Sequence, residues 1–266
     1  MNAPGRHSAA ATSARTRRAP PSLLLAREAA RPWPSLLFLS PCLAFYTAGL
    51  MWVRPDLAAG VDLLLRRALF LAGTAAVLAP AGLVVAILLG WHLVRRDPWR
   101  FPLGLLGAMV VEAAILTIPL LGLHGLFQAF AAGAYPLRVA DHASAGCCAG
   151  ARADLLASAM TSVGAGIYEE LLFRLVLVGG LVLLAEHVFR LEAPGSAVAA
   201  VLVAAALFAG AHTVGAPQAF TWPSFLFRTA AGVYLSALFA LRGFGITAGV
   251  HIVFNLLAKL LLAPAG

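Results

Sequence analysis

Long apolar stretches separated by short polar segments fill most of this chain, and their lengths predict membrane-spanning helices. A helix needs about 20 mainly apolar residues to cross a bilayer once. Six stretches have about that length: 36–53, 68–94, 101–123, 196–214, 223–242 and 245–263. Each is therefore expected to form one transmembrane helix.

A seventh helical stretch, 154–190, is too long for one crossing. At 1.5 Å per residue it would extend over roughly 55 Å. It is expected to be either two helices, with a break at Gly179–Gly180, or one helix that projects well beyond the bilayer. The pattern thus predicts an all-α polytopic membrane protein, a bundle of seven to eight transmembrane helices.

The composition agrees with this pattern and excludes other classes of protein. Charged residues make up 11% of the 266 positions and hydrophobic residues 61%, with a mean hydropathy of +0.90. A soluble domain has roughly 25% charged residues, so this chain lacks the polar residues to cover a soluble surface. An ordinary soluble enzyme, a disordered protein and a disulfide-stapled secreted domain are all excluded.

The polar segments indicate how the chain is organised. Residues 1–31 are rich in arginine, proline and serine and are expected to be a disordered tail, with 32–266 as one intramembrane helical domain. The basic tail favours a cytoplasmic N-terminus, with an organelle transit peptide as the alternative. Segment 54–67 is expected to be a loop or a short interfacial helix, and 124–152 the longest connection.

The arginine-rich composition also bears on location and partners. The net charge is +8, but the tail has no aromatic interleaving and no nucleic-acid motif, so the bilayer, rather than nucleic acid, is the expected partner. Arginine far outnumbers lysine, and alanine and glycine are abundant, which is typical of a GC-rich bacterial genome. We therefore expect an integral multi-pass protein of a bacterial inner membrane.

A few charges fall inside the apolar stretches, where they are costly and indicate function by default. Glu112 is alone in its stretch and is expected to be either a protonated carboxyl bonded to a neighbouring helix or a substrate contact. Lys259 and Glu186 lie near helix ends, where Lys259 can extend to the interface. Arg228 lies in a late apolar stretch. The remaining charges form a cluster, Glu169, Glu170 and Arg174.

Helix geometry separates the two carboxylates of this cluster. Glu170 and Arg174 are i,i+4 neighbours and are expected to form an ion pair. Glu169 points about 100° away from Glu170 and is left uncompensated, so it is available as a general base or acid. The alternative is an ion-pair cluster that only fixes helix packing.

Two histidines in late apolar segments add further chemistry. His212 follows Phe208 at i,i+4, and His251 and Asn255 share one helix face. A carboxylate, two imidazoles and an amide donor are the groups needed to activate a water and stabilise an oxyanion in amide hydrolysis. Glu169, His212 and His251 would equally serve as a His-His-Glu zinc site with an open position.

The chain resembles the CPBP family of intramembrane proteases, which includes the CAAX prenyl proteases and the bacteriocin-processing Abi proteases. Three motifs carry this resemblance in the family's order: Glu169-Glu170-x-x-x-Arg174, Phe208-x-x-x-His212 and His251-x-x-x-Asn255. Segment 227–235 also resembles the glycine-bearing helix that precedes the last motif. The resemblance covers about 155–262, the expected catalytic core, and leaves the first 150 residues without a family signature.

The resemblance implies an intramembrane endopeptidase and a role for each motif residue. Glu169 would activate the attacking water with help from His212, and Glu170 would pair with Arg174. His251 and Asn255 would stabilise the oxyanion, and Phe208 would pack beside the site. The family has been described both as metal-dependent and as glutamate-dependent and metal-free. We favour the metal-free mechanism and therefore expect no cofactor. The alternative is a single zinc ion at Glu169, His212 and His251.

Two other functions compete with the protease. A non-proteolytic immunity or scaffold protein on the same fold would have no need of the intact set of glutamate, histidine and asparagine residues. A proton-coupled transporter using Glu112 and Glu169 would often show internal repeats, and none is visible. The expected substrate is a membrane-embedded or membrane-associated polypeptide, and a prenylated substrate is not expected in a bacterium.

Overall fold

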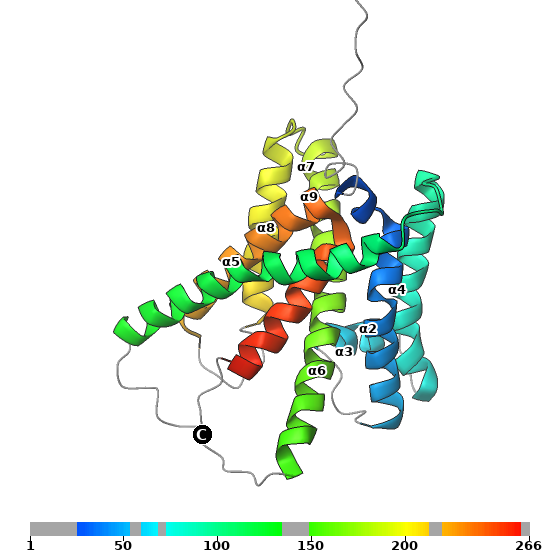
Figure 1. Ribbon diagram of the computed structural model, residues 1–266. Coiled ribbons are helices and arrows are strands. Elements are labelled where there is room, and N and C mark those ends of the chain that lie inside the picture. Colours follow the sequence, from blue (N-terminus) through cyan, green and yellow to red (C-terminus); the bar gives the residue numbers. More distant parts are fainter. Residues whose placement is uncertain (1–25, 54–59, 69–72, 135–148, 213–219, 262–266) are drawn as a thin grey trace, which may run out of the picture.

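The computed structural model describes residues 26–53, 60–68, 73–134, 149–212 and 220–261 (Figure 1). All regular structure in these ranges is helical. The elements are α2 (Pro32–Trp52), α3 (Gly60–Ala68), α4 (Gly73–Arg95), α5 (Gly104–Ala134), α6 (Ala149–Glu170), η2 (Leu171–Val178), α7 (Gly179–His187), α8 (Gly195–Ala211) and α9 (Trp222–Leu261). The all-α fold expected from the sequence is therefore confirmed.

Four helices in the described ranges are long and apolar enough to cross a membrane: α2, α4, α5 and α9. Helix α8 is equally apolar but shorter. Helix α9 has 40 residues and corresponds to two predicted spans, because a kink at Gly243 divides it. Together these helices make the chain a polytopic membrane protein, as predicted.

The long stretch around 154–190 forms one continuous helical segment from α6 through α7. The break expected at Gly179–Gly180 is not there, since Gly179 has helical backbone angles (φ −57°, ψ −47°). The irregularity lies earlier, in the π-helix η2, which begins directly after Glu170. A π-helix changes the rotation per residue and is often found at functional sites.

Helix α9 is the central element of the core. It packs against α2, α5, α6 and α8, and Figure 1 shows α5 crossing the upright helices α2, α4 and α6. Two glycines let the backbones approach closely: a Cβ at Gly166 would overlap Ile252 of α9, and one at Gly232 would lie 3.0 Å from the Cα of Ala205 in α8. These contacts hold α6 and α8 against α9, and they bring the three motif-bearing segments together.

The N-terminal segments differ from the expectation in detail. Most of the predicted tail, 1–25, lies outside the described residues. Of the connection expected at 124–152, residues 135–148 also lie outside them, while the residues before and after belong to α5 and α6. Residues 26–29 form a helical turn, and Ala29 is buried, so they are not part of a disordered tail. The short helix expected within 54–67 is α3, whose buried Asp62 accepts a hydrogen bond from the Tyr46 hydroxyl (2.8 Å) and pairs with Arg66 (2.7 Å).

Gly243 is expected to be indispensable for the kink in α9. Its φ of 78° is unfavourable for any residue with a Cβ, and a Cβ there would lie 2.7 Å from the Cα of Ala30. We expect Gly243→Ala to lower the melting temperature of the detergent-solubilised protein by several degrees, corresponding to a loss of about 2 kcal/mol or more. Gly179→Ala is the matched control, because it has a helical backbone and open space around the new Cβ. Equal melting temperatures for the two variants would contradict this account.

Candidate active site

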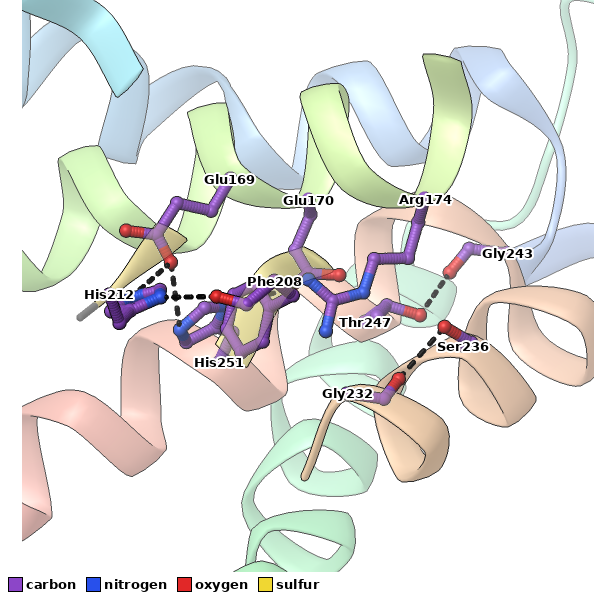
Figure 2. A network of polar contacts seen from close by, with 10 residues as sticks. All are labelled: Glu169, Glu170, Arg174, Phe208, His212, Gly232, Ser236, Gly243, Thr247 and His251. Carbon is purple, nitrogen blue, oxygen red and sulfur yellow. Dashed lines mark hydrogen bonds and ion pairs between the residues drawn. The ribbon is translucent and has the colours of Figure 1, made fainter. Parts of the chain in front are cut away.

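The two glutamates stand at the junction of α6 and η2, in the interior of the fold. Glu169, Glu170 and Arg174 project from this one helical segment toward α8 and α9 (Figure 2). The side chain of Glu170 is fully buried, whereas that of Glu169 is 11% exposed. The side chain of Glu169 is therefore slightly accessible, although its Oε2 is buried, and that of Glu170 is not accessible.

Glu170 binds two partners through a single oxygen. Its Oε1 lies 3.1 Å from Arg174 Nη1, which is the i,i+4 ion pair expected from the sequence. The same oxygen accepts a hydrogen bond from His251 Nδ1 at 2.6 Å. Glu170 thus joins η2 to α9 and fixes the orientation of the His251 ring, a contact that the sequence did not reveal.

Glu169 faces the two histidines instead. Its Oε2 lies 3.5 Å from His212 Nε2 and 3.8 Å from His251 Nε2 (Figure 2). This oxygen is buried and has no hydrogen-bond donor within the described part of the chain. The structure therefore brings three predicted site residues, from three separate helical segments, to one point.

The other ring nitrogen of each histidine is already used. His212 Nδ1 lies 2.8 Å from the Phe208 carbonyl oxygen and donates its proton there, and His251 Nδ1 donates to Glu170. In a neutral imidazole this leaves Nε2 without a proton. A bare Nε2 and a carboxylate oxygen are both acceptors, so the contacts with Glu169 require a shared proton or a bridging donor.

Phe208 forms the wall between these groups. Its ring is buried and packs edge-on against Phe173 (5.1 Å between ring centroids) and His212 (4.6 Å). The guanidinium carbon of Arg174 lies 4.4 Å from the centroid of the same ring. A cation over an aromatic face is stabilised by the ring quadrupole. Phe208 thus packs beside the site, in the position that the resemblance implied.

Asn255 lies on the same face of α9 as His251, one turn further along the helix. Its side chain is half-buried and makes no hydrogen bond to another described residue. Of the six predicted site residues, it is the one that forms no hydrogen bond or ion pair with the other described residues of the set. Its amide remains available to a substrate oxygen.

The other intramembrane charges have partners of their own. Glu112 is not a lone carboxyl, because it forms an ion pair with Arg242 of α9. Glu186 accepts a hydrogen bond from Ser196 (3.0 Å), and Lys259 donates to the hydroxyls of Thr161 (2.7 Å) and Ser162 (3.2 Å). The expectation that Glu112 has no charged partner is therefore wrong, whereas Lys259 is exposed near the end of α9, where it can extend to the interface as expected.

The zinc alternative requires ligands that converge on one point. Among the residues that the structure describes, no group of three or more histidine, cysteine, aspartate or glutamate side chains is arranged to hold a metal ion. Zinc binding by Glu169, His212 and His251 stays a prediction from the sequence.

Comparison with known families identifies the segment that carries the motifs. Residues 151–257 match the family described as type II CAAX prenyl endopeptidase Rce1-like. This match confirms the predicted resemblance of the segment to the CAAX protease family. Comparisons with curated proteins and with solved structures gave no match. The match to this family supports the general activity of a CAAX-type intramembrane protease.

Proposed function

We propose that this protein is an endopeptidase that hydrolyses peptide bonds of membrane-embedded or membrane-associated polypeptides with a water activated by Glu169. One observation carries the proposal: Glu169 Oε2 lies within 3.5 Å of His212 Nε2 and 3.8 Å of His251 Nε2 with no hydrogen-bond donor of its own among the described residues. A buried carboxylate between two imidazoles is suited to hold a water and take its proton.

The first step is the attack of water on the scissile carbonyl carbon. Glu169 accepts one proton of the water, and His212 accepts a hydrogen bond from the other at Nε2, because its Nδ1 is committed to Phe208. The new carbon–oxygen bond produces a tetrahedral intermediate. When the carbon–nitrogen bond breaks, Glu169 returns its proton to the leaving amine, so the carboxylate is restored.

The second requirement is stabilisation of the oxyanion, which we assign to His251 and Asn255. His251 can donate from Nε2 only as an imidazolium, since its Nδ1 proton is bonded to Glu170. The buried cluster contains two carboxylates and one permanent cation, Arg174, so an additional proton on His251 makes it neutral overall. Preorganised donors of this kind are commonly worth a factor of 10²–10³ each in turnover.

The substrate and its surroundings follow from the same proposal. A site formed within apolar helices is accessible to a segment that is itself in or at the bilayer, so we propose a membrane polypeptide as substrate. An inner-membrane location in a bacterium with a cytoplasmic N-terminus remains our prediction from the arginine-rich composition.

The test is cleavage of a fluorogenic membrane peptide by the purified protein in lipid nanodiscs. We expect turnover by the wild type and a loss of about 10²–10⁴-fold in His212→Gln, because proton transfer by a positioned side chain contributes that much. His187→Gln, which alters an exposed histidine at the end of α7, should cleave like the wild type. Absence of cleavage by the wild type, or full activity of His212→Gln, would overturn the proposal.

Metal dependence is tested separately. We propose a metal-free mechanism and expect phenanthroline to leave the cleavage rate unchanged, within about twofold, while elemental analysis finds no stoichiometric zinc. Inhibition that is reversed by added zinc, together with zinc bound at one equivalent per chain, would favour the His-His-Glu site instead. A non-chelating phenanthroline isomer controls for direct inhibition by the aromatic compound.

A further inference from the structure

Arg228 is an intramembrane cation that the proposed mechanism does not use. It lies six residues into α9, within a segment long and apolar enough to cross a membrane, and its side chain is only partly exposed. A charged group at such depth is costly, and it normally marks a binding site or has a charged partner. The described residues include no carboxylate in an ion pair with it; its hydrogen bond is to the hydroxyl of Ser224 on its own helix.

The packing of α8 against α9 places Arg228 beside the candidate site. The two helices touch at Ala205 and Gly232 and follow one another in the chain. Arg228 lies one turn before Gly232, and His212 lies two turns after Ala205. Both residues therefore lie toward the same end of the α8–α9 contact. Arg228 interacts electrostatically with both His212 and Glu169, in agreement with this placement.

Lys259 is another cation outside the ion-paired cluster that interacts electrostatically with Glu169. Unlike Arg228, it has hydrogen-bond partners on another helix. Lys259 donates to two hydroxyls of α6 and is the more exposed of the two. Arg174, within the cluster of Figure 2, is paired with Glu170. Arg228 is thus the cation beside the site that has no ion pair among the described residues. A planar guanidinium is suited to bind a carboxylate through two parallel hydrogen bonds.

We propose that Arg228 binds a carboxylate of the polypeptide substrate next to the scissile bond, and so makes the protein selective for substrates that carry an acid there. The carboxylate is either an acidic side chain or the C-terminal carboxylate. Arg228 is a specificity residue in this proposal, because it contacts the substrate away from the reacting atoms. The inference rests on the proposed peptidase function and adds a preference that the catalytic residues do not explain.

The experiment measures binding, so that it does not depend on turnover. Full-length Glu169→Gln protein in phosphatidylcholine nanodiscs is titrated with fluorescent peptides that share one apolar segment of about 20 residues. The peptides carry either glutamate or glutamine at both boundaries of this segment, and either a free or an amidated C-terminus. Comparison of the four peptides shows which carboxylate is bound.

We expect at least one acid form to bind about 10–100-fold more tightly than its amide counterpart, as is typical of a charge-assisted pair in a partly buried site. Arg228→Gln should remove this preference without weakening the binding of the neutral peptide. Arg228→Lys should retain part of it. Arg190→Gln, which alters an exposed arginine beyond α7, should leave the preference intact.

Three results would overturn the proposal. Equal binding of acid and amide forms, or no binding of any peptide, would mean that Arg228 only extends toward the interface. Equal weakening of all peptides by Arg228→Gln would indicate a structural role. A preference that vanishes when the nanodiscs contain phosphatidylglycerol would assign the site to a lipid phosphate. Failure of wild-type cleavage, by contrast, would overturn the peptidase function, and acid-selective binding would still be measured.

Discussion

Glu169→Gln is expected to reduce peptide cleavage by about 10²–10⁴-fold, the contribution typical of a general base. Glutamine has the shape of glutamate but cannot take the proton of the attacking water. The Glu170–Arg174 pair and its bond to His251 do not involve Glu169, so the fold should persist. Cleavage of a membrane peptide in nanodiscs measures the loss, and the melting temperature checks that folding is unchanged.

The control for this variant is Glu186→Gln, the same change in the same continuous helical segment. Glu186 accepts a hydrogen bond from Ser196, and a glutamine can accept that bond equally well, so full activity is expected. Glu169→Asp adds a test of position, because withdrawing the carboxylate by roughly 1 Å commonly costs about 10²-fold. Equal turnover by the wild type and Glu169→Gln would refute the proposed mechanism.

The sequence was sufficient to predict the short-range part of the site. The spacing of Glu170 and Arg174 predicted their ion pair, which the structure contains at 3.1 Å. The pairing of Glu169 with His212 followed from the family resemblance, and the two groups lie 3.5 Å apart. Both predictions depend on local helix geometry or on motifs, and these are visible in one sequence.

Contacts between distant helices could not be predicted in the same way. The bond from His251 to Glu170 and the pair between Arg242 and Glu112 each join residues more than 80 positions apart. Arg242 falls at the junction of two predicted spans, where an arginine is expected to face water, so Glu112 was left without a partner. Which charges meet depends on how α5 and α6 pack on α9, and no periodicity within one helix encodes that.

The π-helix is another feature that no local pattern predicted. Residues 171–178 are apolar except for Arg174, and this composition is equally compatible with an α-helix. Segment η2 packs against α8 and α9, and its wider turn alters the direction in which Arg174 leaves the helix axis. The composition of this segment therefore does not reveal the π-helix, and the break expected at Gly179 lies eight residues after the start of η2.

Arg174→Met is expected to destabilise the fold by about 3–5 kcal/mol, because it removes one partner of a fully buried ion pair. Glu170 would retain its charge in an apolar interior with only His251 to compensate it. Methionine is close in length and can occupy the space over the Phe208 ring, which lies 4.4 Å from the guanidinium carbon. The loss should therefore arise from the uncompensated charge more than from lost packing.

The matched test is the double variant Glu170→Gln/Arg174→Met, in which both charges are absent. It should recover most of the stability lost in Arg174→Met, since replacement of a whole buried pair by neutral groups is often close to neutral. Arg190→Met controls for the loss of an exposed arginine. Thermal unfolding in one detergent compares these three variants with the wild type. If the double variant were no more stable than Arg174→Met, the buried charge on Glu170 would not be the cause, and the contact of Arg174 with Phe208 would be the main contribution of this arginine.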